Sequence, residues 1–148
     1  MTNAYDAVYK WFDVMHQSGN AVAGYVIMPN HIHVLLYLAP QSKPLNLIIG
    51  NAKRFLAYEM VRRLETAGRL DILQQLNTNV RPEERQNGKK HQVWESSFDA
   101  KECVTEKFIV QKLNYMHHNP LSGKWQLNAR KLCAFELLLL HDWGAGCL

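Results

Sequence analysis

Residues 24–40, "GYVIMPNHIHVLLYLAP", place two histidines one residue apart inside an otherwise apolar run. The segments on either side of the "MPN" turn, 21–27 and 31–38, are rich in β-branched and aromatic residues and predict the two strands of a hairpin. Side chains alternate across a strand, so His31 and His33 share one face. Two imidazoles at this spacing can converge on one divalent metal ion. A pair of strand histidines without a ligand is the alternative interpretation.

The rest of the chain contains three segments in which apolar residues recur at helical spacing. The predicted helices cover residues 4–16, 45–67 and 105–119. Gly19 and Gly68 are expected to end the first two helices, and Thr105 is a suitable N-cap for the third. Pro120 stops the third helix because proline cannot continue it.

Two further segments complete the predicted order of elements. Residues 69–91 are polar and mixed, and "VRPEERQNGKKH", residues 80–91, predicts a loop. "QVWESSFDA", residues 92–100, is a short candidate strand. The order helix, strand, strand, helix, loop, strand, helix indicates an α+β sandwich with helices on one face of an antiparallel sheet.

The amino-acid composition limits the class of protein to which the chain can belong. The chain has 148 residues, of which 47% are hydrophobic, and this suits one domain of two packed layers. Lys and Arg number 17 against 13 Asp and Glu, a mild excess that permits a phosphate-bearing partner without proving one. Cys103, Cys133 and Cys147 lack metal-ligand spacing, which predicts reduced thiols in a cytoplasmic protein. The apolar stretches are too short to span a bilayer, so we expect no membrane partner.

The segment "QKLNYMHHNPLSGKW", residues 111–125, carries a second polar pattern. Gln111, Tyr115 and Asn119 are spaced four residues apart and lie along one stripe of a helix. The tyrosine hydroxyl and the carboxamide four residues later can reach the same point in space. A solvent-facing tyrosine and a helix-ending asparagine are the alternative.

"YVIMPNHIHVLL" followed by "KLNYMHHNPLSGKW" resembles the single-tyrosine HUH transposases of insertion sequences, and most closely the REP-associated tyrosine transposases. The resemblance runs from about residue 20 to about residue 126. It implies that residues 1–126 form an HUH transposase-like catalytic domain. It also implies a ferredoxin/RRM-like sandwich.

The resemblance assigns roles to four residues. His31 and His33 match the paired ligands of a divalent ion, Mg²⁺ or Mn²⁺, Asn119 matches the third ligand, and Tyr115 matches the nucleophile. Such enzymes cut single-stranded DNA, attach its 5′-phosphate to the tyrosine and release a 3′-hydroxyl, and the REP-linked members bind DNA hairpins. The chemistry is reasonable, because a cation stabilises charge on the phosphate and a phenol with a pKa near 10 needs activation.

Basic and aromatic side chains supply candidate contacts to DNA. The basic candidates are Lys53, Arg54, Arg62, Arg63, Lys112 and Lys124. Trp94, Phe98 and Trp125 are candidates for stacking on bases. A solvated charged face and ordinary core packing are the respective alternatives.

Both ends of the chain depart from the family pattern. The family opens with a central strand before its first helix, whereas this sequence starts at the helix. We therefore expect that the first strand is missing, that the start is mis-assigned, or that a partner chain supplies the strand. Residues 127–148, which include "FELLLL", form an atypical C-terminal segment that suggests a frameshift or a gene remnant.

Three functions follow as hypotheses. The first is a metal-dependent transposase or endonuclease that cleaves and rejoins single-stranded DNA through a 5′-phosphotyrosine. The second is a catalytically degenerate remnant of such an enzyme that still binds hairpin DNA. The third is a hydrolase that acts on a small phosphoester through the histidine pair, with Tyr115 incidental. The active unit is a monomer or a homodimer.

Overall fold

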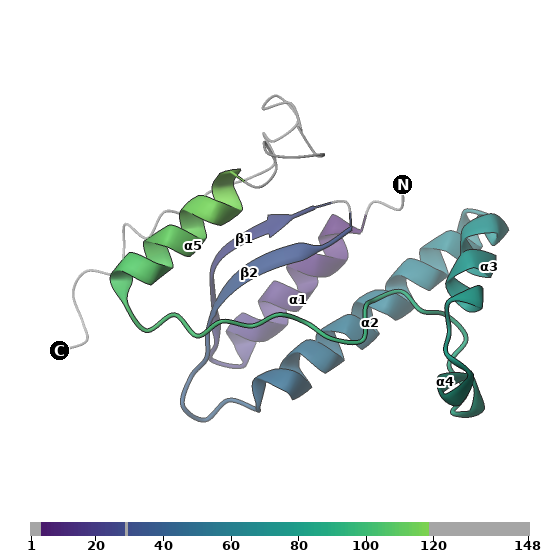
Figure 1. The fold of residues 1–148 in the computed structure, drawn as a ribbon, viewed down its shortest axis with the longest axis horizontal. Coiled ribbons are helices and arrows are strands. Elements are labelled where there is room, and N and C mark those ends of the chain that lie inside the picture. The colour runs from purple at the N-terminus through teal and green to yellow at the C-terminus, as the bar shows by residue number, and fades with distance from the viewer. Residues whose placement is uncertain (1–3, 29, 119–148) are drawn as a thin grey trace. The chain divides into compact units, whose positions relative to one another are not determined.

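The computed structural model describes residues 4–28 and 30–118. In this part of the chain the fold is α+β, with five helices and a two-stranded antiparallel sheet (Figure 1). The elements are α1 (Tyr5–Gln17), β1 (Ala21–Ile27), β2 (Ile32–Tyr37), α2 (Leu45–Thr66), α3 (Leu70–Thr78), α4 (Pro82–Gln86) and α5 (Glu106–His118). The α+β class, the hairpin and the three helices expected from the sequence are confirmed. None of the described helices has the length and apolar character needed to cross a membrane.

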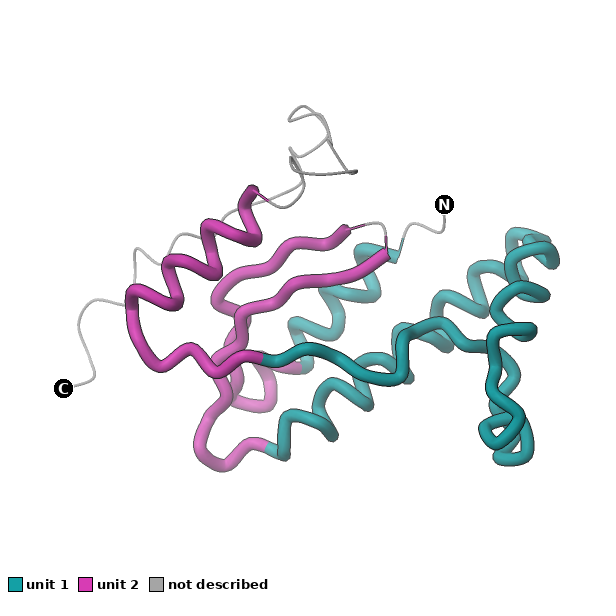
Figure 2. Tube along the Cα trace, in the orientation of Figure 1, with its two compact units in different colours: residues 1–14, 43–100 teal, residues 15–42, 101–148 magenta. Residues whose placement is uncertain are grey.

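The chain divides into two compact units (Figure 2). Unit 1 consists of residues 1–14 and 43–100, and it contains α2, α3, α4 and most of α1. Unit 2 consists of residues 15–42 and 101–148, and it contains the hairpin and α5. Each unit is therefore built from two segments that are far apart in the sequence.

The hairpin of unit 2 has a register that fixes which side chains share a face. Val26 pairs with His33 and Gly24 pairs with Leu35, with an irregularity between Val22 and Gly24. Residues directly opposite each other in an antiparallel pair project to the same side. Val26 and Gly24 consequently lie on the face of the hairpin that carries His33.

The core of unit 2 forms between this face and α5, which runs alongside β1 (Figure 1). Val26, Met28 and Met116 are buried together, and Leu35 and Leu113 pack against them. The apolar side of α5 therefore rests on the hairpin face that bears His33. Burial of these side chains holds the helix in place.

A buried asparagine closes the open end of the hairpin. Asn20 lies directly after Gly19, whose φ of +77° ends α1, and only 4% of its surface is exposed. Its Oδ1 accepts hydrogen bonds from the backbone N–H of Ala39, at 3.0 Å, and from the hydroxyl of Ser42. One side chain thus ties the start of β1 to the segment that follows β2.

We expect Asn20→Ala to destabilise the protein by about 1–3 kcal/mol, because the buried N–H of Ala39 loses its acceptor. Urea denaturation followed by circular dichroism would measure the free energy of unfolding. Ser42→Ala is the matched control: it removes a donor but leaves the bond between Asn20 and Ala39 intact, so it should cost less. Equal stability of Asn20→Ala and wild type would contradict this account.

In unit 1, the prediction of a loop over residues 80–91 was wrong at Pro82–Gln86, where α4 forms. The sequence analysis also missed α3, which forms in the stretch described as polar and mixed. Gly68, with φ of +64°, ends α2 and lets the chain turn back against it. In α3, "LDILQQLNT", the leucines recur at helical spacing and Leu73 is buried. In α4, Pro82 occupies the first turn, where its missing N–H costs nothing.

The prediction of a strand over residues 92–100 was also wrong. The N–H of Gln92 donates to the carbonyl of Leu76 at 2.9 Å. The carbonyls of Glu95 and Ser97 accept hydrogen bonds from the Lys53 ammonium at 2.7 and 2.9 Å. Backbone groups of this segment therefore pair with single partners from unit 1 rather than with a neighbouring strand.

Candidate active site

The two histidines meet at the turn end of the hairpin. The Nε2 atoms of His31 and His33 lie 3.2 Å apart, and the ring centroids are 4.8 Å apart with the planes nearly perpendicular. Asn30 Oδ1 lies 2.6 Å from His31 Nδ1, and the N–H of Met28 donates to the carbonyl of His31 at 2.8 Å. One ring nitrogen of His31 therefore faces the amide oxygen of Asn30, and the other faces His33.

Tyr115 completes the cluster from α5. Its ring centroid lies 5.6 Å from that of His33, with the planes at 80° in an edge-on arrangement. The side chain is 58% exposed, so the phenol contacts the imidazole while remaining open to an incoming molecule. The structure thus brings together three residues that the sequence analysis selected: His31, His33 and Tyr115.

Local features of α5 place the phenol there. Thr105 caps the helix as expected, with its Oγ1 accepting a hydrogen bond from the N–H of Phe108 at 3.3 Å. Leu113 and Met116, on either side of Tyr115 in the sequence, pack into the core of unit 2. The apolar anchors therefore fix the rotation of the helix and turn Tyr115 toward His33.

The environment favours a neutral His33. Its burial, together with the charge of His31 nearby, lowers the pKa of His33 below the usual value of 6.5. At neutral pH the ring is therefore uncharged. A neutral imidazole is the form that binds a metal ion.

The histidine pair has a separation suited to a shared cation. Two nitrogen ligands about 2.1 Å from one ion would lie about 3.0 Å apart at a right angle and about 3.4 Å apart at the tetrahedral angle. The observed 3.2 Å falls between these values. Within residues 4–28 and 30–118, no group of three or more His, Cys, Asp or Glu side chains is placed to hold a metal ion. The two imidazoles can therefore occupy two coordination positions of one ion. Mg²⁺ and Mn²⁺ also take oxygen ligands such as water and phosphate, which can occupy the other positions.

Two of the predicted residues lie outside the described part of the chain. They are Asn119, the expected third metal ligand, and Lys124, a candidate DNA contact. Both remain predictions.

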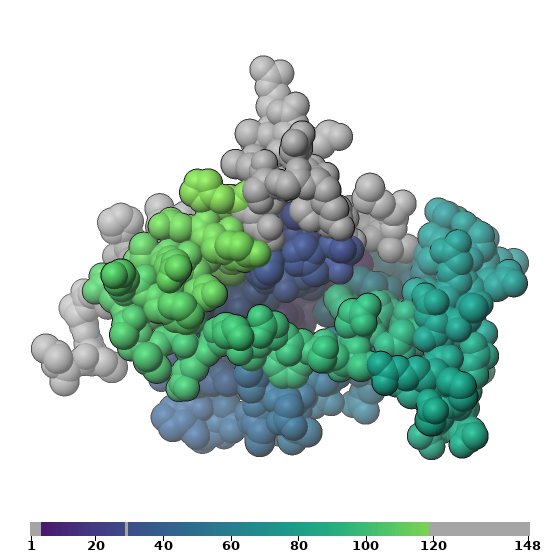
Figure 3. Space-filling view, in the orientation of Figure 1, coloured from purple at the N-terminus to yellow at the C-terminus, as the bar shows by residue number. Residues whose placement is uncertain are grey.

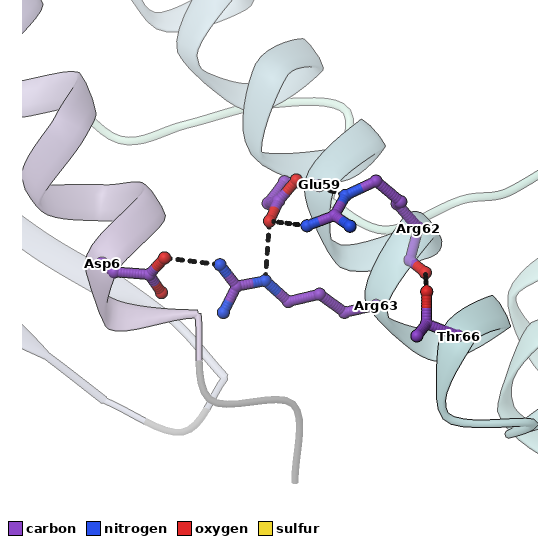
Figure 4. A network of polar contacts seen from close by, with 5 residues as sticks. All are labelled: Asp6, Glu59, Arg62, Arg63 and Thr66. Atoms are coloured by element: carbon purple, nitrogen blue, oxygen red, sulfur yellow. Dashed lines mark hydrogen bonds and ion pairs between the residues drawn. The ribbon is translucent and has the colours of Figure 1, made fainter.

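Two predicted DNA contacts, Arg62 and Arg63, belong to an ion-pair network on unit 1 (Figure 4). Arg62 makes two hydrogen bonds to Glu59, at 2.9 and 2.7 Å. Arg63 bridges Glu59, at 2.8 Å, and Asp6 of α1, at 2.6 Å. Hydrogen bonds from Arg62 and then Arg63 lower the pKa of Glu59 to about 2. Arg62 is exposed whereas Arg63 and Glu59 are half-buried, so Arg62 is the more accessible of the two guanidinium groups.

The other basic candidates have different surroundings. The Lys53 ammonium is bound by the carbonyls of Glu95 and Ser97, which assigns it a structural role in unit 1. Arg54 is exposed and lies 3.3 Å from Asn51 Oδ1. The Lys112 ammonium lies 4.9 Å from the centre of the Phe108 ring, on unit 2. Lys53 and Arg54 thus lie on α2, as Arg62 and Arg63 do, whereas Lys112 lies on α5.

Sequence reasoning missed Gly24, which sets the approach of α5 to the hairpin. A Cβ at Gly24 would lie 2.8 Å from Leu113 Cδ2 and 3.6 Å from Met116 Cε. Only glycine allows the helix to pack this closely without a shift of the leucine. A glycine inside a strand was the available signal, since it often marks close backbone approach.

We expect Gly24→Val to cost about 1–3 kcal/mol of stability through overpacking, and to lower any activity that needs Tyr115 beside His33. Urea denaturation would measure the first effect. Gly50→Ala is the matched control, because a Cβ at Gly50 meets nothing within 4 Å and alanine is the better helix former. A Gly24→Val protein as stable as wild type would refute the packing role.

The candidate site therefore consists of a histidine pair suited to a cation and a phenol beside it, all within unit 2. No family model, no curated protein and no solved structure matches the chain.

Proposed function

We propose that the chain is a metal-dependent transposase or endonuclease of the single-tyrosine HUH type, which cleaves and rejoins single-stranded DNA through a 5′-phosphotyrosine. The observation that carries the proposal is the position of the Tyr115 ring, 5.6 Å from that of His33, whose Nε2 lies 3.2 Å from that of His31. The motif resemblance described above supports the same assignment.

Each residue has a defined task in this proposal. The Tyr115 oxygen attacks the phosphorus, the bond from phosphorus to the 3′ oxygen breaks, and the phenol's proton is lost as the 3′ oxygen gains one. His31 and His33 would hold the divalent ion, with Asn119 as the third protein ligand. An ion bound there would supply positive charge for the phosphate oxygens. Attack of a 3′-hydroxyl on the phosphotyrosine reverses these steps and rejoins the strand.

The proposal extends to the fold and the active unit. It includes a ferredoxin/RRM-like sandwich, with helices on one face of an antiparallel sheet. His33 and Tyr115 meet within a single chain. That favours a site built by one chain, whether the protein acts as a monomer or as a homodimer.

The direct test is incubation of the protein with end-labelled hairpin-containing single strands and Mn²⁺, followed by a denaturing gel. We expect a band in which the 5′ end of the cut strand is attached to the protein, and its loss in a chelator. Salt-sensitive hairpin binding with no cleavage product would instead indicate the non-catalytic DNA-binding remnant. Absence of both binding and cleavage would refute the proposal.

A further inference from the structure

One face of α2 presents aromatic rings to solvent. The side chains of Phe55 and Tyr58 are 52% and 70% exposed. Arg54 and Arg62 are exposed as well, and helical spacing places all four side chains on one side of the helix. We call these four residues the α2 aromatic face. α2 (blue) forms part of the visible molecular surface (Figure 3).

This face is separate from the part of α2 that stabilises the fold. The buried residues of the helix are Ala52, Leu56 and Leu64. Large aromatic rings that remain exposed bury little apolar area, so their contribution to folding is small. Single apolar side chains on a surface are common and need no explanation. Two neighbouring aromatic rings flanked by guanidinium groups are instead typical of a surface that binds a ligand.

The charges of α2 indicate a polyanion as the occupant. The helix carries four basic side chains and two acidic ones. Arg62 is 64% exposed and makes two hydrogen bonds to Glu59, so a phosphate that contacts Arg62 shares it with that carboxylate or displaces it. Aromatic rings stack on bases while arginines contact the backbone, and this combination is typical of surfaces that bind single strands without sequence preference.

We propose that the α2 aromatic face binds single-stranded DNA, with bases stacked on Phe55 and Tyr58 and phosphates contacted by Arg54 and Arg62. The inference rests on the proposed function, which requires a single-stranded substrate, and it names a binding surface on unit 1. It differs from the stacking candidates selected from the sequence, which did not include these two rings.

The test measures binding of the full chain to a fluorescein-labelled oligothymidylate by fluorescence anisotropy, in a chelator so that cleavage does not contribute. We expect Phe55→Ala and Tyr58→Ala each to weaken binding roughly 5- to 100-fold. Tyr58→Phe keeps the ring and should bind like wild type. Arg54→Ala should reduce the slope of log affinity against log salt by about 0.7.

Tyr5→Ala is the matched control, since Tyr5 is 47% exposed on α1 and lies outside this face. Its affinity should be unchanged. Unchanged affinity in both Phe55→Ala and Tyr58→Ala would overturn the inference, as would an equal loss in Tyr58→Phe. A change of sedimentation in the two alanine variants, with normal DNA binding, would assign the face to contacts between copies and would also overturn it.

The same experiment separates this inference from the proposed enzyme. A protein that binds through Phe55 and Tyr58 but forms no covalent adduct keeps the inference and refutes the enzyme. A protein that forms the adduct while both alanine variants bind normally keeps the enzyme and refutes the inference.

Discussion

Tyr115→Phe is expected to abolish covalent attachment of the protein to single-stranded DNA and to leave noncovalent binding nearly unchanged. The substitution removes only the phenolic oxygen and keeps the ring that contacts His33 edge-on. No other atom of the side chain can form the phosphotyrosine, so adduct formation should fall below detection. A denaturing gel with labelled single strands and Mn²⁺ measures the adduct, and anisotropy measures binding.

Tyr37→Phe is the matched control, because Tyr37 is also an exposed tyrosine of unit 2. It should form the adduct like wild type. A Tyr115→Phe protein that still became linked to DNA would show that the nucleophile is another residue. Metal-dependent turnover of a small phosphoester, retained in Tyr115→Phe, would favour the hydrolase hypothesis.

His31→Ala and His33→Ala should each eliminate cleavage and weaken Mn²⁺ binding more than about 100-fold. The reason is that each variant removes one nitrogen of a pair separated by 3.2 Å, and a single imidazole cannot hold the ion in place. Electron paramagnetic resonance of free Mn²⁺ measures the affinity independently of activity. A chelator should reproduce the loss of cleavage in the wild-type protein.

His16→Ala serves as the control, since His16 is an exposed histidine in the last turn of α1. It should bind Mn²⁺ and cut DNA like wild type. Thermal melts would establish that the two histidine variants remain folded. Adduct formation at the wild-type rate in either of them would show that the histidine pair does not hold the catalytic ion.

Local patterns were sufficient to predict the elements of unit 2. Alternation of side chains placed His31 and His33 on one face of a strand, and Gly19 and Thr105 marked helix ends that the structure confirms. These signals need only neighbouring residues in the chain. The short helix α3 was missed because its leucines occupy only nine residues within a polar stretch. The false strand over 92–100 had suitable residues but no partner strand, which only the tertiary structure reveals.

The candidate site, too, was predictable only as far as neighbouring residues in the chain determine it. The sequence linked Tyr115 to the two histidines only through the resemblance of its motifs to a known family. Their meeting depends on Gly24, where α5 approaches β1, and on the burial of Leu113 and Met116. No periodicity in either segment specifies that contact. Its geometry therefore had to come from the structure.

The division of unit 2 into two segments affects the order in which the protein folds. The β-hairpin closes a short loop, whereas the contact of His33 with Tyr115 closes a loop that contains most of unit 1. Contacts of high sequence separation carry a larger entropic cost and form late. A nascent chain would thus emerge from the ribosome with its histidines already in a hairpin, and Tyr115 would join them only after residues 43–100 of unit 1 had been synthesised.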